Sequence, residues 1–257
     1  ACETPTRASE KSAFQAVVPT MLKDHHTTMT PPLAITDFDF STQPANQDAL
    51  IKAWVPEIEA AAAEYVPDDR FVAFLIAAIR LGARSKSLEG FNLLQVVEKA
   101  GYSRSTFFRL FEGYTAFLFK GYKLSCLLSI KVYARHLNAQ ERTLDEFCTF
   151  TADAFFGANC TVPNEIVQML WREHNLPHLE FHPHLSELAL VMAPYLAQNP
   201  QTQHLKIDFD EFDGVLKSFD LDILTARLEG NPLWGTPFYY NKLRKMLQGY
   251  LVACAQQ

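Results

Sequence analysis

Two short helical patterns meet at a tight bend in residues 91–111, which read FNLLQVVEKAGYSRSTFFRLF. Asn92 is a good N-cap for the first pattern, and Gln95 stands three residues later, at the second position of a capping box. Gly101 has the place of a left-handed C-cap, and Ser103 can cap a further helix that begins directly after it. Helices joined this closely form either a helix-turn-helix, whose second helix can enter a DNA major groove, or an ordinary helical corner.

Helical patterns continue on both sides of this bend. The spacing of apolar residues, the caps and the glycines predict four helices around it, over residues 69–83, 93–100, 104–111 and 115–137. Residues 47–65 carry a further helical pattern, which Pro56 is expected to kink or to divide by starting a second helix. Residues 1–45 are polar and contain several prolines, so we expect a flexible arm there.

The segment from Val96 to Phe111 resembles the DNA-reading motif of the TetR/AcrR family of bacterial transcriptional regulators. The pattern of that family runs roughly I-A-x-x-A-G-V-S-x-G-T-[LF]-Y-x-[HY]-F, and the matching positions here are Ala100, Gly101, Ser103, Thr106, Phe107 and Phe111. The likeness extends back to Asp69. Residues 185–197, 209–228 and 241–253 also fit the last three helices of the family, although such helices carry little specificity.

The resemblance implies an all-α homodimer, in which each subunit has a three-helix DNA-binding head, a fourth helix as connector and a larger helical body. The body would bind a small-molecule effector and dimerise, and the bound effector would alter binding to a pseudo-palindromic operator in double-stranded DNA. The chain then divides into an arm (1–45), a helical extension (46–67), a helix-turn-helix DNA-binding domain (68–123) and a ligand-binding and dimerisation domain (124–257). We expect the dimer helices to be Leu185–Gln198 and Phe209–Leu228.

The resemblance also carries DNA contact over to eight positions, which are Asn92, Ser103, Arg104, Ser105, Thr106, Phe108, Arg109 and Tyr114. Arg104 stands at the start of the recognition helix and can read guanine in bidentate fashion. Three positions depart from the family pattern. Phe108 stands where the family usually has Tyr, Leu110 where it has His or Tyr, and Tyr114 where it has Lys. Fewer phosphate contacts would weaken DNA binding and lower its salt dependence, unless other basic residues compensate.

Charge is unevenly distributed along the chain. The net charge is −6, yet residues 68–123 hold nine Lys and Arg against five Asp and Glu. A basic segment in an acidic chain indicates that one part meets a polyanion, although a solvated basic face would look the same.

Other signals narrow the class of protein. The five cysteines have no C-x-x-C spacing, which favours a reducing compartment and a cytoplasmic protein, and no apolar run is long enough to span a membrane. No nucleotide-binding, hydrolase or zinc-protease motif is present, so we expect neither an enzyme nor a cofactor.

The middle of the predicted body is rich in aromatic and sulfur-containing side chains, which suit a pocket for an apolar effector or a plain core. The candidate effector residues are Phe147, Phe150, Phe155, Met169, Trp171, Met192 and Tyr195. His174, His178, His182 and His184 lie near acidic residues, but prolines interrupt their helical spacing. We therefore expect loop histidines at an acidic surface rather than metal ligands.

These observations predict a ligand-responsive, dimeric transcriptional regulator, with repression as the expected direction. The alternative is a sensor or partner-binding protein that keeps the fold and has lost its operator, as the apolar substitutions at Phe108, Leu110 and Tyr114 suggest.

Overall fold

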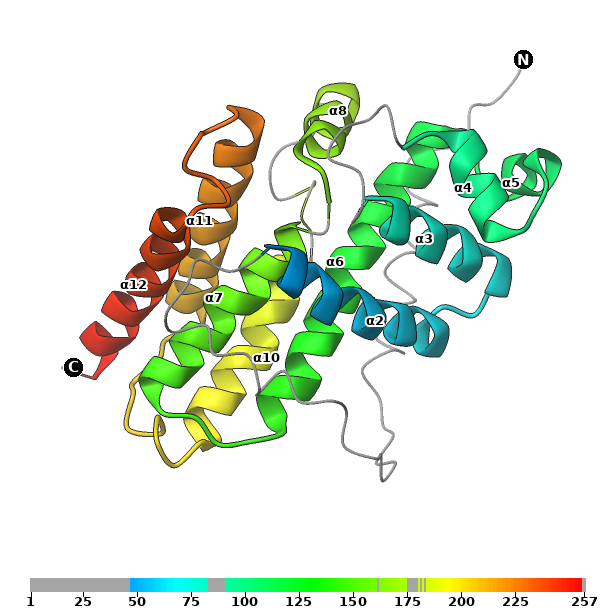
Figure 1. The fold of residues 1–257 in the computed structure, drawn as a ribbon. Coiled ribbons are helices and arrows are strands. Elements are labelled where there is room, and N and C mark those ends of the chain that lie inside the picture. The colour runs from blue at the N-terminus through cyan, green and yellow to red at the C-terminus, as the bar shows by residue number, and fades with distance from the viewer. Residues whose placement is uncertain are drawn as a thin grey trace, which may run out of the picture. The chain divides into compact units, whose positions relative to one another are not determined.

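The computed structural model is helical throughout the residues that it describes, which are 47–82, 91–160, 162–174, 180, 182 and 184–255 (Figure 1). No strand occurs among these residues, so the predicted all-α class is confirmed. They all belong to one compact unit. In this part of the chain no helix is both long enough and apolar enough to cross a membrane. The residues of the expected arm lie outside the described part of the chain.

Helix α2 (Gln47–Tyr65) continues through Pro56, so no second helix begins at that residue. Pro56 lies on the exposed side of the helix, where water can solvate the carbonyl group that a proline leaves without a donor. Ion pairs tie α2 to its neighbours. Arg80 of the following helix donates hydrogen bonds to both carboxylate oxygens of Glu59, each at 2.6 Å, and Arg135 donates to Glu64 at 2.8 Å.

The four helices predicted around the bend are confirmed to within one residue at each described end. They are α3 (Asp69–Gly82), α4 (Leu93–Ala100), α5 (Arg104–Leu110) and α6 (Tyr114–Asn138). The predicted capping box is formed, because Asn92 Oδ1 accepts from the Gln95 amide at 3.1 Å and the Asn92 amide donates to Gln95 Oε1 at 3.2 Å. Gly101 has the left-handed conformation expected of a C-cap, with φ of 74°. These caps limit α4 to eight residues and turn the chain directly into α5.

An aromatic cluster holds α3, α5 and α6 together. Phe74 and Phe107 are fully buried, and their rings pack edge to face at 5.3 Å between centroids. Phe117 of α6 packs against Phe107 at 5.2 Å and against Phe111 at 4.8 Å. Each of these rings buries a large apolar area in a favoured geometry, so a helix of only seven residues can hold a fixed position.

The remaining helices pack around the C-terminal part of α6. They are α7 (Leu144–Cys160), α8 (Asn164–His174), α10 (Leu185–Gln198), α11 (Phe209–Leu228) and α12 (Pro237–Cys254). α10 packs against both α6 and α11, α12 packs against α7, and α8 packs against α11. α6 is continuous through the predicted domain boundary at residues 123 and 124, so one helix runs from the α3–α5 region into the larger part of the molecule (Figure 1).

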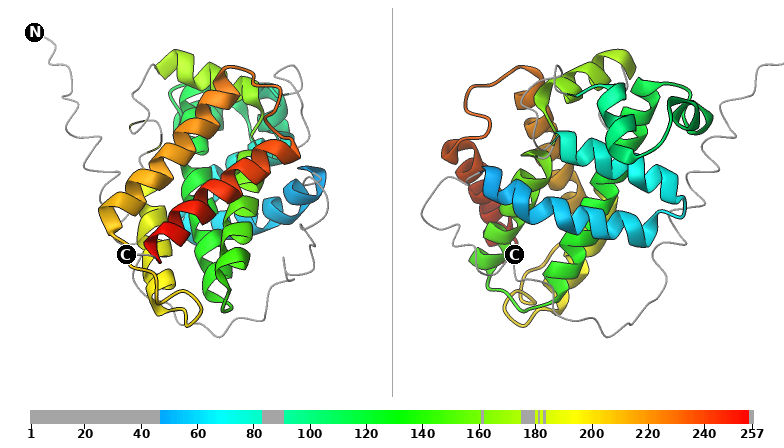
Figure 2. Two further views of the ribbon diagram at one scale, coloured as in Figure 1. Left: turned by 90° about the vertical axis from the view of Figure 1, so that its left-hand side faces the viewer. Right: turned by 45° about the vertical axis from the view of Figure 1, so that its right-hand side comes forward.

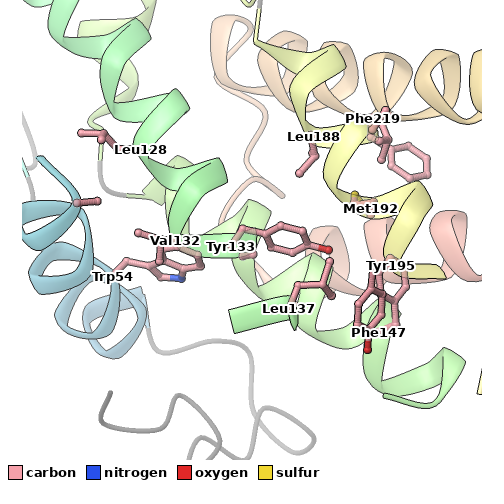
Figure 3. Close-up of a cluster of buried hydrophobic side chains, with 14 of the residues drawn as sticks. Trp54, Leu128, Val132, Tyr133, Leu137, Phe147, Leu188, Met192, Tyr195 and Phe219 are labelled. Atoms are coloured by element: carbon pink, nitrogen blue, oxygen red, sulfur yellow. The ribbon is translucent and has the colours of Figure 1, made fainter. Parts of the chain in front are cut away.

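The main core draws one or more side chains from most of these helices. Figure 3 shows Trp54 of α2, Tyr133 of α6, Phe147 of α7, Met192 of α10 and Phe219 of α11 in this cluster, and all five are buried. Their burial fixes the helices around α6 by the hydrophobic effect.

α11 and α12 lie side by side on one side of the molecule (Figures 1 and 2). Asp222 joins them, because its Oδ2 accepts from the Tyr239 hydroxyl at 2.6 Å and its Oδ1 accepts from Lys242 Nζ at 2.7 Å. The two helices thus form a pair that is linked by polar contacts as well as by packing.

Candidate functional site

The start of α5 presents polar side chains to solvent. Ser103, Arg104 and Ser105 are exposed. Ser103 Oγ accepts from the Thr106 amide at 3.1 Å, and the same oxygen lies 2.8 Å from Ser105 Oγ. Arg104 has no ion-pair or hydrogen-bond partner among the described residues. The helix therefore begins with a network of hydroxyl groups beside a guanidinium group that can reach an external partner.

The next turn of α5 has one buried and one exposed aromatic side chain. Phe107 anchors the helix in the aromatic cluster, whereas the adjacent Phe108 leaves 54% of its surface exposed. Arg109 is also exposed and approaches Thr106 Oγ1 at 3.4 Å, which is a weak contact. The outward face of α5 is therefore cationic at both ends, with an aromatic ring between the two arginines.

The two flanking candidates, Asn92 and Tyr114, are already engaged within the chain. Asn92 is exposed but uses its side chain in the capping box of α4. Tyr114 is half-buried, and its hydroxyl donates to the carbonyl of Phe91 at 3.3 Å. Burial raises the pKa of Tyr114 well above its ordinary value. Both residues fix the positions of α4 and α6 around α5.

A cavity of about 80 Å³ lies alongside α6, in the larger part of the molecule. This is several times the roughly 10–15 Å³ that one water molecule needs. Its wall includes side chains from α2, α6, α7, α10 and α11, and from the segment before α10. The described lining residues are Trp54, Tyr122, Ser125, Cys126, Ser129, Ile130, Tyr133, Ala154, Phe155, Asn159, Val162, His182, His184, Leu185, Leu188, Asp220 and Arg227.

A buried polar chain crosses one side of this cavity. The Tyr122 hydroxyl lies 2.6 Å from His182 Nε2, and His182 Nδ1 makes a short hydrogen bond to Asp220 Oδ2. His182 therefore links Tyr122 of α6 to Asp220 of α11. Burial raises the pKa of Tyr122 well above its ordinary value, so the phenol keeps its proton.

Arg227 supplies the second charged group in the wall. Its side chain is 1% exposed and donates to Asn164 Oδ1 at 3.0 Å, to Asn159 Oδ1 at 2.9 Å and to the Val162 carbonyl at 2.5 Å. Three neutral acceptors thus fix the guanidinium group at the junction of α7 and α8. These hydrogen bonds join α11 to the end of α7 and the start of α8.

The histidines depart from their expected position. His182 and His184 lie in the segment before α10, but they are buried and face the cavity rather than an acidic surface. His174 ends α8, where its ring stacks on Phe119 at 3.9 Å, and His178 lies outside the described residues. The two prolines of this segment, Pro177 and Pro183, lie outside the described residues. No group of three or more potential metal ligands forms among the described side chains.

Neither a protein-family model nor a curated protein matches this chain. No function is therefore transferred from a relative. The assignment depends on the exposed face of α5 and on the cavity beside α6.

The candidate effector residues are only partly brought together. Phe155 lies in the cavity wall. Phe147, Met192 and Tyr195 are buried in the main core, and Phe150 packs against that core with its ring stacked on Tyr133 at 5.1 Å. Met169 and Trp171 pack against the cluster that contains Phe74 and Phe107. Six of the seven candidate effector residues are therefore not among the described lining residues of the cavity beside α6.

Sequence reasoning overlooked the polar face of α6. Tyr122, Ser125, Ser129 and Tyr133 are three or four residues apart and all line the cavity. At this spacing they lie on one side of a helix. A polar stripe on a helix that must be largely buried was the signal that could have located the site. Cys126 lies on the same stripe, and burial raises its pKa to about 12, so it stays a thiol at neutral pH.

A second cavity of about 60 Å³ adjoins the first. The two share Tyr122, Ser125, Ser129 and Val162 in their walls. Phe91 and Phe117, which pack with the α3–α5 helices, also line the second cavity. The same face of α6 therefore contacts the cavity in the larger part of the molecule and the aromatic cluster behind α5.

Proposed function

We propose that this protein is a transcriptional regulator that binds double-stranded DNA through α5 and responds to a small-molecule effector in the cavity beside α6. The observation that carries the proposal is the α4–Gly101–α5 unit. Its second helix is anchored by Phe107 and presents Arg104 without a partner among the described residues. This is the arrangement that a helix-turn-helix of the TetR type uses to read a major groove.

In this proposal different side chains on the exposed face of α5 contact the bases and the phosphate backbone. Arg104 reads a guanine, and the hydroxyl groups of Ser103 and Ser105 contact the phosphate backbone. Phe108 meets the methyl group of a thymine, because an exposed ring can make the apolar contact that this base offers in the major groove. Arg109 adds a second positive charge toward the backbone.

α6 connects the effector to the DNA in this scheme. A ligand beside Tyr122 would change the position of α6, which also carries Phe117 in the aromatic cluster behind α5. Because the ligand would bind one position of α6 better than the other, it would shift the population of DNA-binding molecules. Repression relieved by the effector is the simplest regulation that this arrangement supports.

A homodimer would supply the two copies of α5 that a pseudo-palindromic operator requires. Large apolar side chains are exposed on both helices that would form the interface, which are Leu190 of α10 and Leu221 of α11. Exposed apolar residues of this kind favour burial against a second copy.

The proposal is tested by fluorescence anisotropy, with the full chain and DNA from its own promoter region, at several salt concentrations. We expect binding that outcompetes unrelated DNA and weakens as salt rises. Arg104→Ala should cost about 1–3 kcal/mol and relax the preference at one base pair. Arg172→Ala is the matched control, because Arg172 is an exposed arginine of α8, away from α5. Equal affinity for promoter and unrelated DNA, with and without candidate effectors, would contradict the proposal.

A second function is supported by the apolar side chains on the same unit. Leu94 and Phe108 are both more than half exposed, and Tyr102 is exposed between them in sequence. These residues suit a protein partner better than a phosphate backbone. If the surface binds a protein, Phe108→Ala should disrupt that complex, whereas Arg104→Ala should leave DNA retention unchanged.

A further inference from the structure

We infer that Arg244 of α12 is a pH-dependent switch that exchanges partners on α7. It pairs with the exposed Asp145 carboxylate while the buried Asp153 carboxyl group is protonated, and it pairs with Asp153 once that group has given its proton to water. The inference goes beyond the proposed function, because it concerns the attachment of α12 to α7 and depends on neither DNA nor an effector.

The contacts between α7 and α12 place Arg244 between two carboxyl groups. The Tyr240 hydroxyl donates to Asp153 Oδ1 at 2.6 Å, and Gln248 Nε2 donates to Asp145 Oδ1 at 3.3 Å. The two helices are therefore antiparallel here, and these contacts lie eight residues, or about 12 Å, apart on each helix. Arg244 is midway between Tyr240 and Gln248, so one carboxyl group stands about one helical turn to either side of it.

The guanidinium group of Arg244 is only partly used in its pairing with Asp145. Its Nη1 donates to Asp145 Oδ1 at 3.1 Å, and the side chain of Asp145 is 62% exposed. Its Nε is buried and has no hydrogen-bond partner among the described residues. An exposed ion pair contributes little stability, and a buried donor without an acceptor costs free energy. Arg244 is therefore held weakly and has a donor left for a second acceptor.

Asp153 is suited to be that acceptor. It is 5% exposed, and its hydrogen-bond partner in the described part of the chain is the uncharged Tyr240 hydroxyl. Burial raises the pKa of Asp153 to about 7, although the hydrogen bond from Tyr240 and the charge of Arg244 both act to lower it. The ionised carboxylate is a buried anion, and pairing with a cation offsets part of its desolvation cost.

The other ionisable groups of the helices that pack on α7 have partners of their own or stay neutral. The paired groups are Glu57 with Arg135 and His136, Glu64 with Arg135, Glu59 with Arg80, and Lys242 with Asp222. Burial raises the pKa of the Cys148 thiol to about 12 and the pKa of the Tyr133 phenol well above its ordinary value, so both keep their protons. Arg244 is thus the described cation that acts on Asp153.

The inference is tested by NMR spectroscopy of the full chain between about pH 5 and about pH 9. The Asp153 carboxyl carbon and the Arg244 Nε–H are assigned through bonds on the wild-type chain. We expect the carboxyl carbon to titrate with a midpoint within about one pH unit of 7. The Arg244 Nε–H should shift with the same midpoint, because it gains a charged acceptor. The Nε–H of Arg80, which already donates to Glu59 at 2.6 Å, should show no such step.

Charge substitutions separate the switch from the effect of burial alone. Arg244→Gln removes the cation and should raise the Asp153 midpoint by at least about one pH unit, which is tenfold in proton affinity. Asp145→Asn removes the competing partner and should lower the midpoint by at least about half a pH unit. Lys242→Gln is the matched control, because Lys242 is a cation of the same helix that pairs with Asp222. It should move the midpoint by less than about 0.3 pH unit.

The exchange of partners is tested by double-mutant cycles in urea unfolding. The cycle of Arg244→Gln and Asp145→Asn gives the coupling between these side chains as a ratio of unfolding constants. We expect a coupling of about twofold to fivefold at about pH 5.5, as exposed ion pairs show, and less than about 1.5-fold at about pH 8.5. The cycle of Arg80→Gln and Glu59→Gln should keep its coupling at both pH values, because these side chains pair with each other and have no second partner in the described part of the chain.

Three results would overturn the inference: Asp153 does not titrate near neutral pH, the Arg244 Nε–H does not follow its titration, or the coupling of Arg244 to Asp145 is equal at both pH values. If a variant fails to fold, the two titrations on the wild-type chain still decide. These measurements contain neither DNA nor an effector, so the inference and the proposed function can fail independently.

Discussion

Asp153 is a buried carboxyl group whose ionisation opposes folding. Its Oδ1 accepts from the Tyr240 hydroxyl, and burial, as the main cause, raises its pKa from 3.8 to about 7. Because the folded pKa lies above the unfolded value, the folded state holds the proton more tightly. The resulting stabilisation is complete below about pH 4 and is lost as the pH rises through about 7.

We therefore predict that Asp153→Asn flattens the pH dependence of stability. Between pH 5 and pH 8 the wild-type chain should lose on the order of 2 kcal/mol of unfolding free energy from this group, and the variant should not. Urea unfolding at several pH values measures the difference. Asp210→Asn, which changes an exposed aspartate at the start of α11, should keep the wild-type slope. Parallel curves for the wild type and Asp153→Asn would contradict the assignment.

Single residues differ in how far the sequence alone determines their place. Asn92, Gly101 and Ser103 were predicted correctly because a cap depends on neighbours within four residues. Tyr122 and His182 are 60 residues apart, and Asp220 is another 38 beyond. Their contact depends on how α6, α11 and the segment between α8 and α10 pack, which local patterns do not specify.

The turn between α4 and α5 requires a left-handed backbone conformation at one residue. Gly101 has φ of 74°, although a Cβ built there would meet nothing within 4 Å. The restriction is therefore conformational rather than steric. We predict that Gly101→Ala lowers stability by about 1 kcal/mol.

Gly214 in α11 is the control for this prediction, because it is an exposed helical glycine whose Cβ would also meet nothing. Gly214→Ala should raise stability by up to about 1 kcal/mol. Thermal unfolding of the two variants should thus shift the midpoint in opposite directions. A stabilising Gly101→Ala would mean that this turn has no left-handed residue.

The sequence predicted where helices occur better than it predicted whether a helix continues through a proline. Apolar spacing and caps located α3 to α6 within a residue. Pro56 was expected to disturb α2, but α2 continues because Ala61 and Ala62 are fully buried in the main core and hold the helix in place. Tertiary packing of this kind overrides a local preference.

At the scale of the molecule, the proposed homodimer makes a prediction about mass. Sedimentation equilibrium should give twice the mass of one chain at micromolar concentration. Leu221→Glu places a charge on an exposed apolar site of α11, where 47% of the leucine is accessible, and should shift the equilibrium toward monomer by at least about tenfold.

Leu94→Glu is its counterpart on α4, at a leucine that is 53% exposed. It should leave the mass unchanged, because α4 lies outside the proposed interface. A monomeric wild-type chain, or equal effects of the two substitutions, would place the interface elsewhere or remove it.

The continuity of α6 has a consequence for dividing or recombining the protein. A cut after residue 123 would separate the aromatic cluster from Ile166, Val167 and Leu170 of α8, which are buried in the same cluster, so the α3–α5 region is not a detachable module. Chimaeras must be spliced within α6 in the same helical register. One inserted residue would turn everything before it by about 100° and displace it by about 1.5 Å. The helical register of α6, rather than the length of a linker, therefore determines how the two ends of the molecule can be exchanged in a chimaera.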